Sequence, residues 1–75
     1  MLDEIIALIG RQLHVATPLN PDTRVLSSGL VDSFRLAVLL SDLETRYHVR
    51  IPLHDIGADN FDTPRQMTAF IERRR

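Results

Sequence analysis

The stretch 33–47 constrains the fold most, because its apolar side chains repeat at the period of an α-helix. At about 100° per residue, five large side chains fall on one face of such a helix: Leu36, Leu39, Leu40, Leu43 and Tyr47. A stripe of this width has to be buried against other elements. The opposite face carries Phe34, Val38, Ser41, Asp42 and Thr45, with Arg35 and Arg46 on its edge. We therefore predict a central helix over residues 33–47 with one buried and one exposed face.

Two other stretches have the same period. Near the start, apolar residues recur at spacings of three and four: Leu2, Ile5 or Ile6, Ile9 and Leu13. We predict a helix over about residues 2–15, ending before Pro18, because the residue before a proline is disfavoured in the α conformation.

Near the end, the run Thr63–Gln66 reads Thr-Pro-Arg-Gln, which offers an N-cap, a proline at the first helical position and a glutamine that completes a capping box. The helix that follows has the apolar stripe Met67, Phe70 and Ile71.

The connecting segments lack this periodicity. Residues 17–32 contain two prolines, two serines and a glycine and are predicted to form a long loop, with four apolar residues packed against the core: Leu19, Val25, Leu26 and Leu30. A loop of this length in a small domain is often functional. We predict an extended connector at residues 48–52, with Val49 and Ile51 turned inward, and one short helix or 3₁₀ turn within residues 53–60. Together these elements predict an all-α fold, a small four-helix bundle of three main helices and one short helix, in a single domain over residues 1–75.

The composition restricts the function classes. With 75 residues and no cysteine, the chain depends on helix packing rather than on disulfides or a cysteine-based zinc site. A formal net charge of −1 argues against a generic nucleic-acid binder, which needs a basic surface. The first residues show no cationic n-region, and no apolar run has the length of a membrane span. We expect a soluble, monomeric protein of the cytoplasm.

Ser33 lies where the long loop meets the central helix. Serine is a preferred N-cap residue, so one interpretation is that Ser33 only begins the helix. That interpretation leaves unexplained the long loop and the apolar pair Phe34 and Val38, which lie one turn apart on the exposed face. An anion attached to Ser33 would be stabilised by the free N–H groups and the dipole of the helix N-terminus. These observations favour an attachment site beside a partner surface.

A set of ordered features supports this hypothesis. Asp32-Ser33 is followed by a hydrophobe, Gly29 lies just upstream, and the leucine-rich second helix, Ile51-Pro52, the run Asn60–Thr63 and Phe70-Ile71 follow in order. With these features the chain resembles an acyl carrier protein or the closely similar peptidyl (thiolation) carrier domain, over essentially its whole length.

The resemblance implies a function. A separate phosphopantetheinyl transferase would use coenzyme A and Mg²⁺ to attach 4′-phosphopantetheine to Ser33, and Asp32 would help to engage the transferase. The thiol of the arm would hold an acyl or aminoacyl group as a thioester, loaded by a ligase or an acyltransferase and passed to downstream biosynthetic enzymes. Such a protein is not itself an enzyme. Its partner surface would include Phe34, Arg35, Val38 and Asp42.

Two features depart from the commonest pattern of this family. The spacing Gly29-Leu30-Val31-Asp32-Ser33 contains one more residue than the usual Gly-X-Asp-Ser and resembles D-alanyl carrier proteins and some stand-alone carriers of specialised metabolism. Arg35 and Val38 occupy positions where fatty-acid carriers have a more acidic second helix. An enzyme that recognises a negative stripe would meet a positive charge and an apolar patch here. We therefore expect partners other than those of the housekeeping fatty-acid carrier, in polyketide, nonribosomal peptide or related biosynthesis.

Other kinds of site are poorly supported. His14, His48 and His54 lack the spacing of a metal site, and neither His14 nor His48 is placed to activate Ser33 as a nucleophile. Three aspartates, Asp55, Asp59 and Asp62, are interpreted as a solvated acidic patch, and Arg73–Arg75 as a solvated helix end. The alternatives left open are a carrier-like bundle without an arm that acts as an interaction module and, with less support, a small helical DNA-binding domain.

Overall fold

The computed structural model describes residues 1–13 and 19–75, and within them the chain is entirely helical apart from its connecting segments. The elements in chain order are α1 (Leu2–Leu13), α2 (Ser33–Tyr47), the 3₁₀ helix η1 (Leu53–Asp55), α3 (Ala58–Phe61) and α4 (Pro64–Arg74). No strand occurs in the described part of the chain. The predicted all-α bundle is confirmed. The predicted extension of the first helix beyond Leu13 lies outside the described residues.

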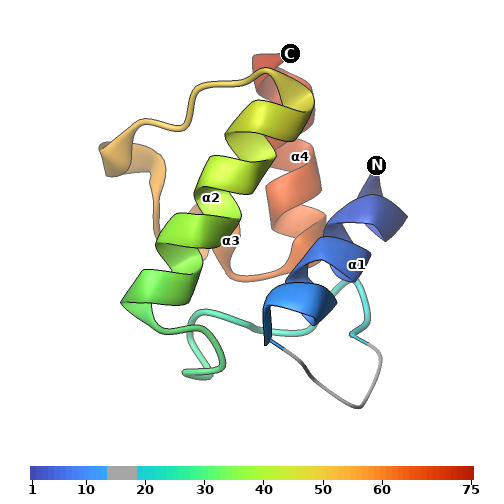
Figure 1. Ribbon diagram of the computed structural model, residues 1–75, viewed down its shortest axis with the longest axis vertical. Coiled ribbons are helices and arrows are strands. Elements are labelled where there is room, and N and C mark those ends of the chain that lie inside the picture. The colour runs from blue at the N-terminus through green and yellow to red at the C-terminus, as the bar shows by residue number, and fades with distance from the viewer. Residues whose placement is uncertain (14–18) are drawn as a thin grey trace.

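The helices surround one core (Figure 1). α4 packs against α1 and α3, and α1 packs against α2. Within the core, the rings of Phe61 and Phe70 lie 5.0 Å apart between centroids at an interplanar angle of 54°, a tilted arrangement that aromatic pairs favour. The remaining core side chains are almost all aliphatic, as expected for a chain with four aromatic residues.

The two faces of α2 are as predicted. Leu39, Leu40 and Leu43 are buried, and Leu36 and Tyr47 are partly buried against the same cluster. The helix ends at His48, which adopts the left-handed conformation (φ 55°) and donates its backbone N–H to the carbonyl of Glu44. The chain therefore turns sharply after α2 and enters the connector.

The connector and the short elements after it hold α2 to the rest of the bundle. Val49 and Ile51 are both buried, as predicted, and the N–H of Ile51 donates to the Glu44 carboxylate at 2.9 Å. The stretch 53–60, predicted to contain one short element, contains η1 and most of α3.

The last helix begins as predicted. Thr63 is the N-cap, Pro64 is the first helical residue, and Gln66 completes the capping box. Gln66 Oε1 accepts the backbone N–H groups of both Asp62 and Thr63. Two orphan donors before the helix are thereby satisfied, which defines where α4 starts.

The long loop runs beneath the helices toward the start of α2 (Figure 1, cyan to green). Val25 is fully buried, and Val31 closes the loop by donating its N–H to the Val25 carbonyl at 3.0 Å. The prediction for Leu30 is wrong, because Leu30 is 41% exposed and its neighbour Val31 is 6% exposed. The hydrogen bond from the Val31 N–H to the Val25 carbonyl holds Val31 rather than Leu30 against the core.

The predicted solvated acidic patch is also wrong for two of its members. Asp62 is buried and accepts hydrogen bonds from the loop, and Asp55 forms an ion pair with Arg74 at 2.8 Å. Only Asp59 is exposed to solvent. Arg74 is exposed, as predicted, and it also pairs with Asp55 of η1 and lies over the ring of Phe70.

Among the described residues, no helix combines the length and the apolar character needed to cross a membrane.

Candidate functional site

Ser33 is the first residue of α2 and is exposed, at the end of the long loop (Figure 1). The loop delivers the chain to this point, and α2 then carries it back across the core. The predicted attachment residue is thus at a corner of the molecule where another protein can reach it.

The N-cap of α2 is Asp32, not Ser33 as the simplest interpretation of the sequence supposed. Asp32 has an extended backbone (φ −87°, ψ 175°), and its Oδ1 accepts the N–H of Arg35 at 2.8 Å. Its carbonyl oxygen accepts the N–H of Leu36 at 2.9 Å, which is the first helical hydrogen bond. At the N-cap position an aspartate is as good a cap as a serine, and its negative charge also suits the helix dipole.

Because Asp32 caps the helix, the hydroxyl of Ser33 is not needed as an N-cap. Within the described residues, Ser33 Oγ takes part in no hydrogen bond. It remains beside the N–H groups of the first turn, which are favourable neighbours for a phosphodiester. An exposed hydroxyl without an internal partner, at a helix N-terminus, fits covalent attachment of a phosphorylated group.

A turn directly before the site sets the path of the loop. The N–H of Gly29 donates to the Leu26 carbonyl at 3.2 Å, and Gly29 has φ +79°. A residue with a side chain is strained in this left-handed region, so the position favours glycine. The glycine in the attachment motif is therefore explained by backbone conformation.

Asp62 anchors the loop and was not identified as an anchor from the sequence. Its Oδ1 accepts the N–H groups of Leu26 and Ser27 at 3.0 and 2.8 Å, and its Oδ2 accepts the Ser27 hydroxyl at 2.8 Å. Burial alone would raise the pKa of Asp62, but the hydrogen bonds from Ser27 and Leu26 and the positive charge of Arg24 outweigh it and lower the pKa. The carboxylate thus stays ionised and holds the loop against the α3–α4 junction. No local sequence signal distinguishes Asp62 from the exposed Asp59.

The four predicted partner residues do not share one face. Phe34 is 77% exposed, and Val38 lies one turn further along the same outer face, partly buried. Arg35 and Asp42 turn toward α1, where Arg35 donates to the Gln12 carbonyl and Asp42 accepts from the Gln12 side chain at 2.8 Å. The structure therefore keeps Phe34 and Val38 as an outer pair and uses the two charged residues to join α2 to α1.

Two other exposed apolar side chains were not identified as surface residues from the sequence. Leu53 is 84% exposed in η1, and Leu30 is exposed in the loop before Ser33. A leucine in a single turn of 3₁₀ helix has few neighbours to pack against. The shortness of this element is the only feature of the sequence that indicates an exposed Leu53.

No group of three or more His, Cys, Asp or Glu side chains among the described residues could hold a metal ion. His48 follows the last residue of α2, roughly 22 Å along the helix axis from Ser33 at 1.5 Å per residue. His54 is exposed in η1 beside Asp55, and His14 lies outside the described residues. The geometry does not place His48 next to Ser33 as a nucleophilic pair requires.

The chain matches the family described as "Phosphopantetheine attachment site" over residues 3–71. It is similar to the D-alanyl carrier protein of Leuconostoc citreum (strain KM20), with 33% identity over 70 residues that cover 93% of this chain and 90% of that protein. It is also similar to the lincomycin biosynthesis protein LmbN of Streptomyces lincolnensis, with 39% identity over 75 residues. That alignment covers 96% of this chain and 26% of LmbN, so the chain spans about a quarter of that relative.

Among solved structures, the fold is similar to a chain in the crystal structure of an FAD-dependent dehydrogenase. The TM-score is 0.81 at 30% identity, and the match covers 91% of this chain and 99% of that chain. The two chains therefore correspond over nearly their full lengths.

Proposed function

Because the chain belongs to the phosphopantetheine attachment-site family, we propose that Ser33 is the residue that carries the 4′-phosphopantetheine arm. The protein is a phosphopantetheine-dependent carrier. The observation that supports Ser33 is its exposed hydroxyl at the N-terminus of α2, left without an internal partner because Asp32 caps the helix.

The attachment chemistry needs little from this chain beyond Ser33. In the active site of a transferase, Ser33 Oγ attacks the phosphorus of coenzyme A that bears the pantetheine, a P–O bond to Oγ forms, and the bond to the second phosphate breaks. The leaving group is adenosine 3′,5′-bisphosphate, and the hydroxyl proton passes to a base of the transferase. Asp32 contributes a fixed negative charge beside the site for the transferase to recognise. The bound arm supplies a thiol that holds an acyl or aminoacyl group as a thioester.

Carriers of this family are not catalysts, and we propose that this protein acts in the same way. Tethering raises the effective concentration of the activated group at each partner enzyme, within the reach of the arm. Its partners are then the transferase, a loading enzyme and the enzymes that modify or release the cargo. We propose that the protein carries its cargo as a monomeric domain in the cytoplasm, where coenzyme A is available.

The surface beside Ser33 favours partners other than those of fatty-acid synthesis. Phe34 and Val38 present an apolar face, and Arg35 places a positive charge at the start of α2. Such a surface selects against enzymes that bind an acidic second helix. With LmbN and D-alanyl carrier proteins as relatives, we propose a role in specialised metabolism or in aminoacyl transfer.

An FAD-dependent dehydrogenase is a specific candidate partner. The solved chain that corresponds to this one over 99% of its own length belongs to the crystal structure of such an enzyme. A thioester acidifies the hydrogen on the adjacent carbon, so a base of such an enzyme would remove that proton and its flavin would accept a hydride from the next carbon. The products are an α,β-unsaturated thioester and the reduced flavin.

Mass spectrometry of the loaded protein after incubation with the dehydrogenase of that crystal structure tests this partner. We expect a loss of two hydrogens from the cargo and reduction of the flavin, neither of which occurs with free cargo. An unchanged mass with several acyl and aminoacyl cargoes would contradict the proposal.

The attachment itself is tested by intact mass after incubation with a promiscuous phosphopantetheinyl transferase, coenzyme A and Mg²⁺. We expect the wild type to gain one phosphopantetheine and Ser33→Ala to gain none. Because Ser33 does not cap α2, Ser33→Ala should also keep its free energy of unfolding within about 0.5 kcal/mol of the wild type. A folded wild-type protein that gains no mass would instead support the interaction module without an arm.

A further inference from the structure

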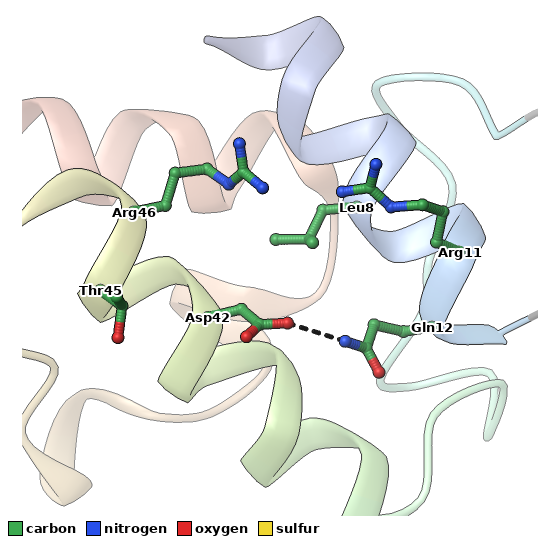
Figure 2. A pocket seen from close by; sticks show the side chains of 6 residues that line it. All are labelled: Leu8, Arg11, Gln12, Asp42, Thr45 and Arg46. Carbon is green, nitrogen blue, oxygen red and sulfur yellow. Dashed lines mark hydrogen bonds between the residues drawn. The ribbon is translucent and has the colours of Figure 1, made fainter.

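A groove with a volume of about 490 Å³ lies between α1 and α2, away from the attachment site. Its lining combines one apolar residue with charged and polar ones: Leu8, Arg11, Gln12, Asp42, Thr45 and Arg46. Figure 2 shows the side chains of Arg11 and Arg46 extending from the two helices toward one another across Leu8, with the Asp42–Gln12 hydrogen bond beside them.

In the part of the chain that the structure describes, the two arginines form no ion pair with a carboxylate. Neither guanidinium lies within 4.0 Å of a carboxylate among the described residues. Asp42 is four residues before Arg46, a spacing at which an acid and a base on a helix often pair. Asp42 instead accepts from Gln12 Nε2 at 2.8 Å, and Arg46 points across the groove.

An acidic residue of α1, Glu4, is also engaged elsewhere. Glu4 accepts from the hydroxyl of Tyr47 at 3.2 Å and lies 3.8 Å from the N-terminal amine. Two like charges that converge across an apolar side chain repel each other, and that repulsion is relieved when an anion binds between them. A guanidinium binds a carboxylate through two parallel hydrogen bonds, so a pair of them forms a specific receptor for acidic side chains.

We propose that the groove between Arg11 and Arg46 docks an acidic segment of a partner enzyme. This inference rests on the proposed carrier function, because the docked enzyme is one that receives the arm. Arg46 lies roughly 20 Å along the α2 axis from Ser33 at 1.5 Å per residue. A partner that holds α2 at this groove leaves Ser33 and the outer pair Phe34 and Val38 free to face its active site. The charge preference is opposite to that of an acidic second helix, which docks basic surfaces.

The experiment uses a synthetic peptide of repeated Glu-Ala-Ala-Glu units and a matched peptide with Gln in place of every Glu. Binding to the full chain, labelled with ¹⁵N, is measured by NMR at low ionic strength through the side-chain Nε–Hε signals of the arginines. We expect the Glu peptide to shift the Arg11 and Arg46 signals and the Gln peptide to leave them unchanged. Arg11→Gln and Arg46→Gln should each weaken binding about two- to fivefold, and the double variant about tenfold, as expected for exposed arginine–carboxylate pairs.

Arg50→Gln is the control, because Arg50 is exposed outside the groove and its loss changes the net charge by the same amount. It should retain wild-type affinity. Equal weakening by Arg50→Gln, or binding that is unaffected in the double variant, would overturn the proposal.

The same samples are then tested for modification by the transferase. We expect Arg11→Gln and Arg46→Gln to gain the arm as the wild type does. A wild type that gains no mass would refute the carrier function while the peptide titration still reports on the groove. A normal mass gain with failed peptide binding would refute only the groove.

Discussion

Asp32 and Ser33 are adjacent oxygen-bearing residues with different tasks at the start of α2. Asp32 Oδ1 accepts the Arg35 N–H, whereas Ser33 is exposed. A helix needs only one side-chain cap, so once the aspartate fills that role the serine is available for chemistry. The pair thus separates helix capping from the proposed attachment at neighbouring positions.

Substitutions at Asp32 can separate its structural role from its proposed recognition role. Asp32→Ala should lower the free energy of unfolding by about 0.5–2 kcal/mol, because the cap is lost. Asp32→Asn should keep nearly all of that stability, since asparagine caps as well, but should slow modification by the transferase if the enzyme recognises the charge. Urea unfolding and the initial rate of mass gain measure the two effects. A normal rate with Asp32→Asn would show that the charge has no part in recognition.

At the scale of elements, α2 carries the core on one face and an apolar pair on the other. Leu43 is fully buried between the helices, whereas Phe34, a larger side chain, is 77% exposed. Hydrophobicity alone does not separate these two residues. Their angular positions on the helix do, since the buried stripe is centred on Leu43.

Leu43→Ala should destabilise the protein by about 2–5 kcal/mol, because it leaves a cavity in the core. Phe34→Ala should change the free energy of unfolding by no more than about 0.5 kcal/mol, because the ring is mostly in water. Chemical denaturation of both variants measures the difference. Since a loss of 5 kcal/mol can exceed the stability of a small domain, Leu43→Met provides a milder core substitution with an expected loss below about 1.5 kcal/mol. Similar losses for Leu43→Ala and Phe34→Ala would contradict the assignment of the faces.

At the scale of the whole molecule, the long loop is held to the bundle by contacts between residues far apart in the sequence. Val25 donates its N–H to the Asp62 carbonyl at 2.7 Å, and the Asp62 carboxylate receives three further hydrogen bonds from Leu26 and Ser27. The loop ends at Ser33, so these contacts also determine where the proposed attachment site lies. Stability and site position therefore depend on the same carboxylate.

The lowered pKa of Asp62 predicts the direction of an acid effect. The folded state binds a proton at Asp62 less readily than the unfolded chain, whose pKa is near 3.8. Above the pKa of the unfolded chain, Asp62 therefore makes its full contribution to stability. This contribution is lost as the pH falls below that value and through the lower pKa of the folded state. Asp62→Asn should cost about 1.5–3 kcal/mol at pH 7, the range for hydrogen bonds to a charged group.

Urea unfolding of the wild type and of Asp62→Asn from neutral to strongly acid pH measures this effect. We expect the difference in free energy of unfolding to shrink as the pH falls below 3.8. Asp59→Asn is the control, since Asp59 is exposed on α3 and should behave like the wild type. A difference that does not change with pH would show that the loop does not depend on the charge of Asp62.

The sequence by itself determined the parts of this protein that rest on local interactions. Helical periodicity predicts α2 and its faces, the Thr63–Gln66 capping box predicts the start of α4, and the order of motifs around Ser33 predicts the attachment site. Only the tertiary structure decided which of Leu30 and Val31 is buried, which aspartate anchors the loop, and where Arg35 and Asp42 point. Periodicity and capping involve neighbours within one or two turns, whereas Asp62 meets Ser27 across 35 positions and Asp42 meets Gln12 across 30. Contacts over such separations depend on how the helices pack, and no local pattern encodes them.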